Sequence, residues 1–176
     1  MARIPYMDLE QMPESLGKLM TNSRPLNIYR MLAHGGAAGE GFLALGSALL
    51  HDNSLDACLR ELVIVRVGIL CRAGYEIHQH TRIARRVGVP DDKIQALYDG
   101  PDAAVFSDEE RTVLRYVDTV VLNVKAGDAA FQTVQALFSH RQLVELHLLI
   151  GFYMLVSRFL ENLEVDLEEK TPPLEG

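Results

Sequence analysis

One run of apolar residues constrains the fold of this 176-residue chain more than any other feature. Leu62-Val63-Ile64-Val65-Arg66-Val67 has the β-branched content that is typical of a buried strand. The apolar pattern, however, extends from about residue 55 to residue 72, and no second run is present to pair with it as a strand. Because an isolated strand leaves its backbone groups without partners, we predict a helix over 55–72. Since this helix is apolar nearly all round, we expect it to lie centrally in the core or beneath another subunit.

Start and stop signals along the rest of the chain predict further helices and no strand. Ser107 with Glu110, and Ser139 with Gln142, fit capping boxes, and Gly88 can end a helix in the left-handed conformation. The expected helices span about 25–33 (starting at Asn22-Ser23-Arg24-Pro25), 40–50, 55–72, 75–87, 91–98, 107–124, 128–138 and 139–163. We therefore predict an all-α fold with an N-terminal arm (1–20), one helical domain (21–164) and a loose C-terminal tail (165–176).

Composition and charge exclude several classes of partner. The formal net charge of -7 argues against nucleic acid and against an anionic membrane surface, since both require a surplus of Lys and Arg. The longest apolar region, 143–160, is interrupted by Glu145, His147 and Arg158, which lipid would penalise. We interpret it as a buried helix. The N-terminus lacks an apolar stretch of signal-peptide length, so we expect a cytoplasmic protein.

The two cysteines agree with this compartment. If Cys58 and Cys71 lie on one helix, about 20 Å separates them, whereas a disulfide requires Cα atoms about 5–6 Å apart. They therefore cannot pair with each other, and we expect two reduced thiols in the core.

Glu76 and His80 are the first candidates for chemistry. Their i, i+4 spacing stacks them on one face of a helix, where the carboxylate can orient the imidazole and raise its basicity, as a general base requires. The alternative is an ordinary exposed ion pair. His78 points to a different face from His80 on a helix, which argues against a metal chelate formed by these two histidines.

Glu61 is the third candidate, because it lies at the start of the most apolar run. A buried carboxylate costs several kcal/mol unless it is paired or protonated. It could instead be a surface residue paired with Arg60 or Arg66.

Several segments together resemble the carboxymuconolactone decarboxylase family, which includes the alkylhydroperoxidase D-like proteins. The resemblance rests on Arg60-Glu61-Leu62-Val63-Ile64, Tyr75-Glu76-Ile77 with His80, and Gly88-Val89-Pro90 with Ile94. Weaker similarities lie upstream, at 29–34 and 42–45, and downstream, at 106–110 and 142–146. The resemblance implies a single-domain helical bundle of the alkylhydroperoxidase D-like type that assembles into a trimer or hexamer.

The peroxidase branch of this family carries a Glu, a Cys-x-x-Cys pair and a His three residues later. On this chain the Glu and His positions fall on Glu61 and His80, and the two thiol positions fall on Ala73 and Glu76. Cys71 lies two residues before the first thiol position. Because thiol peroxidation needs a low-pKa thiolate and a resolving partner, the sequence argues against it.

The thiol-free decarboxylase branch has Glu and His at the spacing of Glu76 and His80. The resemblance implies that His80 carries the proton, that Glu76 orients it, and that Glu61 is a second acid or base or part of the relay. Repulsion between the two carboxylates in one pocket should raise one pKa. Arg66, Arg82 and Tyr75 are the candidates for substrate binding, and the alternative for the two arginines is a solvated or structural ion pair.

We therefore predict a cofactor-independent, metal-independent lyase that acts on a small carboxylated or lactone metabolite from aromatic degradation, as a homo-oligomer. Three alternatives stay open: an alkylhydroperoxidase-like antioxidant protein using Cys71 or Cys58, a non-catalytic ligand-binding relative, and a metal site built from Glu61, Glu76 and His80. One geometric question also stays open. Glu61 precedes Gly74 by about three and a half turns, but His80 follows it by less than about two. A crossing angle or a neighbouring subunit must therefore align the two side chains.

Overall fold

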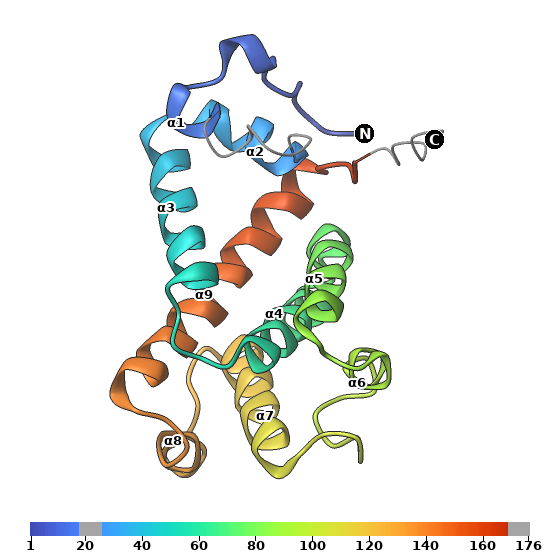
Figure 1. The fold of residues 1–176 in the computed structure, drawn as a ribbon, viewed down its shortest axis with the longest axis vertical. Helices are drawn as coiled ribbons and strands as arrows, with labels where there is room; N and C mark the ends of the chain where they lie inside the picture. The colour runs from blue at the N-terminus through green and yellow to red at the C-terminus, as the bar shows by residue number, and fades with distance from the viewer. Residues whose placement is uncertain (18–25, 169–176) are drawn as a thin grey trace. The chain divides into compact units, whose positions relative to one another are not determined.

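The structure is a computed structural model that describes residues 1–17 and 26–168 (Figure 1). Within these residues it contains helices and no strand, which confirms the predicted all-α class. The helices are α1 (Glu14–Gly17), α2 (Asn27–Leu32), α3 (Ala37–His51), α4 (Ala57–Cys71), α5 (Gly74–Val87), α6 (Asp91–Ala96), α7 (Asp108–Asn123), α8 (Asp128–Gln135) and α9 (His140–Leu163), with 3-10 turns at Leu9–Gln11 and Ala33–Gly35. The predicted helix start at Asn22-Ser23-Arg24-Pro25 lies outside the described residues.

Contacts between residues group the chain into two compact units, 46–161 and 1–45 with 162–176. The smaller unit joins the predicted arm to the predicted tail. Asp166 accounts for this grouping, because its carboxylate accepts hydrogen bonds from the Ala2 backbone amide (3.0 Å) and the Tyr6 hydroxyl (3.1 Å). The described part of the tail, 165–168, is thus held by the arm, whereas we expected it to be loose.

Helix α4 lies at the centre of the larger unit. All residues from Glu61 to Gly68 are buried, and the helix packs against α5 and α7, beside which Figure 1 shows it. Its apolar side chains share a core with residues of the neighbouring segments: Leu62, Val65, Ala84, Val89, Ile94, Ala96, Leu97, Phe106 and Leu114. The β-branched run is therefore a central helix, as predicted, because burial on every side favours it over an unpaired strand.

The predicted signals delimit the helices of this unit. Asp56 caps α4 by accepting a hydrogen bond from a first-turn amide at 2.9 Å. Gly88 ends α5 with a φ of 105°, in the left-handed region that favours glycine. Ser107 and Glu110 form the predicted capping box of α7. These ends agree with the sequence because each cap is a contact between residues close in the chain.

A glycine lets α4 and α5 approach each other closely. A Cβ atom at Gly68 would lie 3.2 Å from Ile77 Cγ1 and 3.5 Å from Glu76 Cβ. Because these distances leave little room for a side chain, Gly68 sets the depth to which α5 packs on α4. It thereby sets the position of Glu76 relative to α4.

Helix α9 is long and apolar enough to cross a membrane by length and composition alone. Half of its most apolar 18-residue window is buried within the protein. Its buried residues follow helical spacing, among them Leu146, Ile150 and Tyr153. These properties are those of a core helix, in agreement with the interpretation of this segment from the sequence.

Candidate active site

The structure brings Glu61, Glu76 and His80 together from two neighbouring helices. Glu61 Oε2 lies 2.8 Å from Nδ1 of His80, and Glu76 Oε2 lies 3.5 Å from Nε2 of the same ring. Glu61 comes from α4, whereas Glu76 and His80 lie one turn apart on α5. The packing of α4 on α5 within one chain is therefore sufficient to align these side chains, and no neighbouring subunit is needed for that.

Glu61 fixes the orientation of the imidazole. Its other carboxylate oxygen, Oε1, accepts a hydrogen bond from Arg60 Nε at 3.1 Å, and its side chain is completely buried. The carboxylate thus lies between the guanidinium of Arg60 and the imidazole, and its Oε2 accepts a hydrogen bond from Nδ1–H of His80. Nε2 is then the atom of His80 that can take up and release a proton.

The structure gives Glu76 a different contact from the one we expected. The sequence suggested that Glu76 orients His80 and that Glu61 is a second acid or base or part of the relay. Glu61 instead makes the short contact with the ring, and Glu76 faces the reactive nitrogen. The i, i+4 spacing predicted the proximity of Glu76 and His80 but contained no information about a closer partner from another helix.

The surroundings of Glu76 change the acidity of its carboxyl. Burial raises the pKa of its carboxyl above the ordinary value of 4.5, the positive charge of His80 lowers it, and the negative charge of Glu61 raises it further. Its Oε2 is buried and has no hydrogen-bond partner. A carboxyl group in this state holds its proton more readily than an exposed one, so Glu76 and Nε2 of His80 together form a site that can store and transfer a proton.

The aromatic ring of Tyr153 completes the surroundings of His80. Tyr153 lies on α9, and its ring meets the imidazole edge-on, with centroids 4.8 Å apart and an angle of 84° between the planes. The sequence analysis missed Tyr153, because nothing distinguishes it from the other buried positions of α9. Only 6% of His80 and 4% of Glu76 are exposed. The cluster is therefore almost completely enclosed by the surrounding protein.

The structure places the three predicted substrate-binding residues in different settings. The guanidinium of Arg66 donates to Asp118 through Nε (2.7 Å) and Nη2 (2.6 Å). Because this pairing is structural and buried, Arg66 is not available to a substrate. Arg82 is exposed, and Tyr75 is 5% exposed.

Neither cysteine belongs to the cluster of Glu61, Glu76 and His80. Cys58 and Cys71 lie at opposite ends of α4, and both are free thiols, as expected. Burial raises the pKa of the Cys58 thiol, whose Sγ donates to the Val87 carbonyl at 3.4 Å. A raised pKa disfavours the thiolate that peroxide chemistry needs.

The described residues offer no group of three or more His, Cys, Asp or Glu side chains arranged to hold a metal ion. His78 is exposed and His80 is buried, so the two histidines point to different faces, as the sequence predicted.

Comparisons with known proteins show which family part of the chain resembles. Residues 36–119 match the sequence profile of the Carboxymuconolactone decarboxylase family. The protein YnjA of Escherichia coli K12 is 32% identical over 113 residues, which span 63% of this chain and 62% of YnjA. The match thus covers less than two thirds of that relative. Over this region the chain is similar to the carboxymuconolactone decarboxylase family, in agreement with the resemblance seen in the sequence.

Solved structures show the same fold. An alkylhydroperoxidase AhpD core from Ralstonia eutropha, described as a peroxidase-related protein, has a TM-score of 0.85 at 18% identity and covers 96% of this chain and 93% of its own. The debrominase Bmp8, solved in complex with 2,3,4-tribromopyrrole, has a TM-score of 0.70 at 16% identity and covers 82% of this chain and 78% of its own. At these identities the likeness shows the fold alone.

Glu76 should make the stability of the protein depend on pH. Because the pKa of Glu76 is raised in the folded state, the protonated carboxyl contributes stability to the fold. This contribution is fully present below about pH 4.5 and is lost as the pH rises through the folded pKa. Glutamine does not titrate, so the free energy of unfolding of Glu76→Gln should rise relative to that of the wild type between pH 4 and pH 8. The expected rise is about 1.4 kcal/mol for each pH unit by which the pKa of Glu76 is raised. Urea unfolding across this range measures the difference. A difference that does not vary with pH would show that the carboxyl titrates normally.

Proposed function

We propose that this protein is a cofactor-independent acid–base enzyme, a lyase that acts on a small carboxylated lactone. The observation that carries the proposal is the proton site formed by His80 Nε2 and Glu76, with the imidazole held by Glu61. The raised pKa of Glu76 supports it, because a general acid must hold a proton near neutral pH. Similarity to the carboxymuconolactone decarboxylase family over residues 36–119 supports the class of substrate.

The reaction needs no more than proton handling and charge stabilisation. The bond between the lactone ring and its carboxylate breaks, carbon dioxide departs, and the electron pair moves into conjugation with the lactone carbonyl to give a dienolate. A proton from Nε2 of His80 or from Glu76 is then added to the distal carbon of the dienolate. Glu61 keeps the imidazole in one orientation during both steps, which lowers the cost of organising the transition state.

A carboxylated substrate also needs a cation near two glutamates. Arg66 is bound to Asp118. We propose that Arg82 attracts the substrate, that Arg60 balances the charge of Glu61, and that Tyr75 shapes the approach. The side chain of Arg60 is 11% exposed and contacts the cluster directly.

A thiol-dependent antioxidant function is the second candidate, and it rests on Cys71. Nη1 of Arg158 lies 3.9 Å from Sγ of Cys71, so a cationic side chain contacts this thiol. The peroxidase-related description of a protein with this fold agrees with it. Against it, Ala73 and Glu76 occupy the thiol positions of the peroxidase motif.

Replacing both cysteines distinguishes the lyase function from the thiol-dependent antioxidant function. We expect the double variant Cys58→Ala/Cys71→Ala to lose some stability but to keep its turnover of carboxymuconolactone, followed by the release of carbon dioxide. We also expect the wild type not to turn over an organic hydroperoxide with a dithiol donor. Loss of activity in a well-folded Cys71→Ala protein, or hydroperoxide turnover that disappears with Cys71, would favour the antioxidant function.

We further propose that the protein is a cytoplasmic homo-oligomer, a trimer or hexamer. Val144, Leu148 and Leu155 of α9 are 58%, 47% and 52% exposed, and their spacing puts them on one face of the helix. Such a row of exposed apolar side chains is typical of an interface. Light scattering at micromolar concentration should give a multiple of the 19.6 kDa chain mass. A monomer mass would contradict the proposal.

A further inference from the structure

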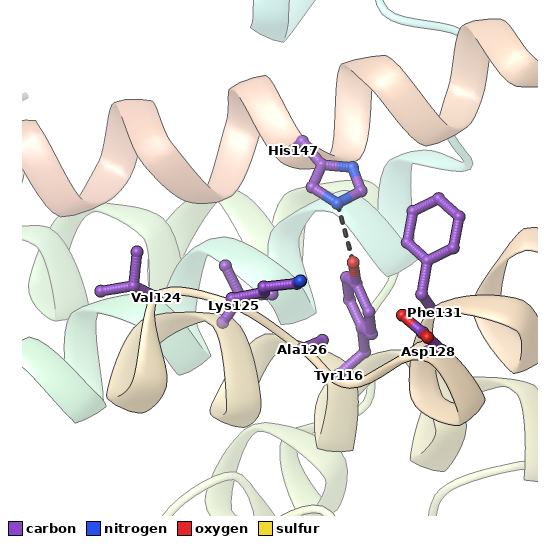
Figure 2. A pocket seen from close by; sticks show the side chains of 8 residues that line it. Tyr116, Val124, Lys125, Ala126, Asp128, Phe131 and His147 are labelled. Atoms are coloured by element: carbon purple, nitrogen blue, oxygen red, sulfur yellow. Dashed lines mark hydrogen bonds between the residues drawn. The ribbon is translucent and has the colours of Figure 1, made fainter.

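A second polar site lies in a pocket of about 340 Å³ to which none of Glu61, Glu76 and His80 contributes. Figure 2 shows this pocket between α9 and the segment that joins α7 to α8. It is lined by Tyr116, Val120, Val124, Lys125, Ala126, Asp128, Phe131 and His147. The volume lies at the lower end of the range for small-molecule sites.

A histidine and a tyrosine on facing helices determine the hydrogen-bonding character of the pocket. Nδ1 of His147 lies 2.7 Å from the Leu143 carbonyl, so this nitrogen carries a proton and donates it. Nε2 of His147 lies 2.8 Å from the Tyr116 hydroxyl and therefore accepts the hydroxyl proton. With its proton directed at His147, the Tyr116 oxygen presents its lone pairs to the pocket, where they accept from a ligand hydroxyl.

The remaining walls are suited to a ring that carries a negative charge. Phe131, Val120 and Val124 supply apolar surface, and the extended side chain of Lys125 points along the pocket toward Tyr116 (Figure 2). Val124 is 86% exposed and has a φ of 65°, an unfavourable conformation for a β-branched residue. An exposed valine held in this conformation is accounted for if it packs on a ligand.

We propose that this pocket binds a small hydroxylated aromatic carboxylate, with the ring between Phe131 and the valines, the carboxylate at Lys125 and the hydroxyl at Tyr116. Each part of the ligand is required by a different group of the pocket. Asp128, which also lines the pocket, disfavours ligands with a second negative charge and can accept a hydrogen bond from a further hydroxyl. The pocket is a binding site separate from the proposed active site, and its occupation does not depend on the proposed function.

Calorimetry with four simple probes tests this assignment. The probes are 3-hydroxybenzoate, 4-hydroxybenzoate, benzoate and phenol, which either combine the carboxylate and the hydroxyl or carry one of them alone. We expect at least one hydroxybenzoate to bind once per chain, more tightly than benzoate or phenol. Failure of both hydroxybenzoates to bind at millimolar concentration would overturn the proposal.

Variants connect the binding to the pocket. Tyr116→Phe should weaken the binding of the hydroxybenzoate about tenfold, because one hydrogen bond is lost, and should leave the binding of benzoate unchanged. Lys125→Gln should weaken the binding of both the hydroxybenzoate and benzoate by a similar factor. Because residue 125 is exposed, this substitution should not disturb folding. Tyr98→Phe and Arg86→Gln, at exposed positions outside the pocket, are the matched controls. Unchanged binding in both pocket variants, or binding that is lost in His80→Gln, would overturn the proposal and place the ligand elsewhere.

Discussion

Replacing His80 with glutamine is expected to lower turnover of carboxymuconolactone by about 10²- to 10⁴-fold, the usual contribution of general acid–base catalysis. Glutamine can hydrogen-bond to Glu61 but cannot take up and release a proton at the position of Nε2. The loss should appear in kcat, because the imidazole acts on the dienolate formed during the reaction and contributes little to binding the ground state. Steady-state kinetics on a protein whose circular dichroism matches wild type provide the measurement.

The chain contains a matched control for this substitution. His78 lies on the same helix, two residues away, and is exposed. His78→Gln should therefore retain the turnover of the wild type. Glu76→Gln should lose less activity than His80→Gln, since it removes an acid but leaves the imidazole in place. Near-normal turnover in His80→Gln would refute the assignment of His80 as proton carrier, whatever the effect of the other substitutions.

Glu61→Ala is expected to destabilise the protein by about 3–5 kcal/mol, the largest effect on stability among these variants. The carboxylate of Glu61 is completely buried and accepts hydrogen bonds from both Arg60 and His80. Its removal leaves the half-buried guanidinium of Arg60 and the buried imidazole of His80 without their partner, and desolvation of these groups is no longer offset. Chemical unfolding, followed by circular dichroism, gives the difference in free energy.

Two further variants separate burial from charge. Glu109→Ala removes an exposed carboxylate from α7 and should change stability by less than about 0.5 kcal/mol. Glu61→Gln keeps an oxygen for the His80 Nδ1 proton but loses the charge that faces Arg60, so it should fall between the other two variants. If Glu61→Ala were as stable as Glu109→Ala, the contacts of Glu61 would make no net contribution to the folded state.

The fold and the candidate site support different conclusions about function. The fold is shared with proteins described as peroxidase-related and with a debrominase, so it defines a scaffold and not one reaction. In this chain a buried carboxyl, Glu76, stands at a thiol position of the peroxidase motif, and burial raises its pKa. This carboxyl supports the proton transfer that we propose.

Much of the fold could be predicted from the sequence because its signals are local. Helix ends at Gly88 and Ser107 depend on residues a few positions apart, and the apolar run around Ile64 has no partner strand. The i, i+4 spacing of Glu76 and His80 likewise follows from helix geometry. These features determined the all-α class, the central helix and two members of the candidate site.

Only the tertiary structure decided which glutamate holds the imidazole. The contact between Glu61 and His80 spans nineteen positions and depends on how closely α5 packs on α4 at Gly68. The raised pKa of Glu76 depends on burial, and burial is a property of the assembled core. The pairing of Tyr116 with His147 spans thirty-one positions and has no signal in either local segment. At both sites, contacts between distant segments of the chain determine which groups meet and how acidic they are. Local patterns in a sequence do not encode such contacts.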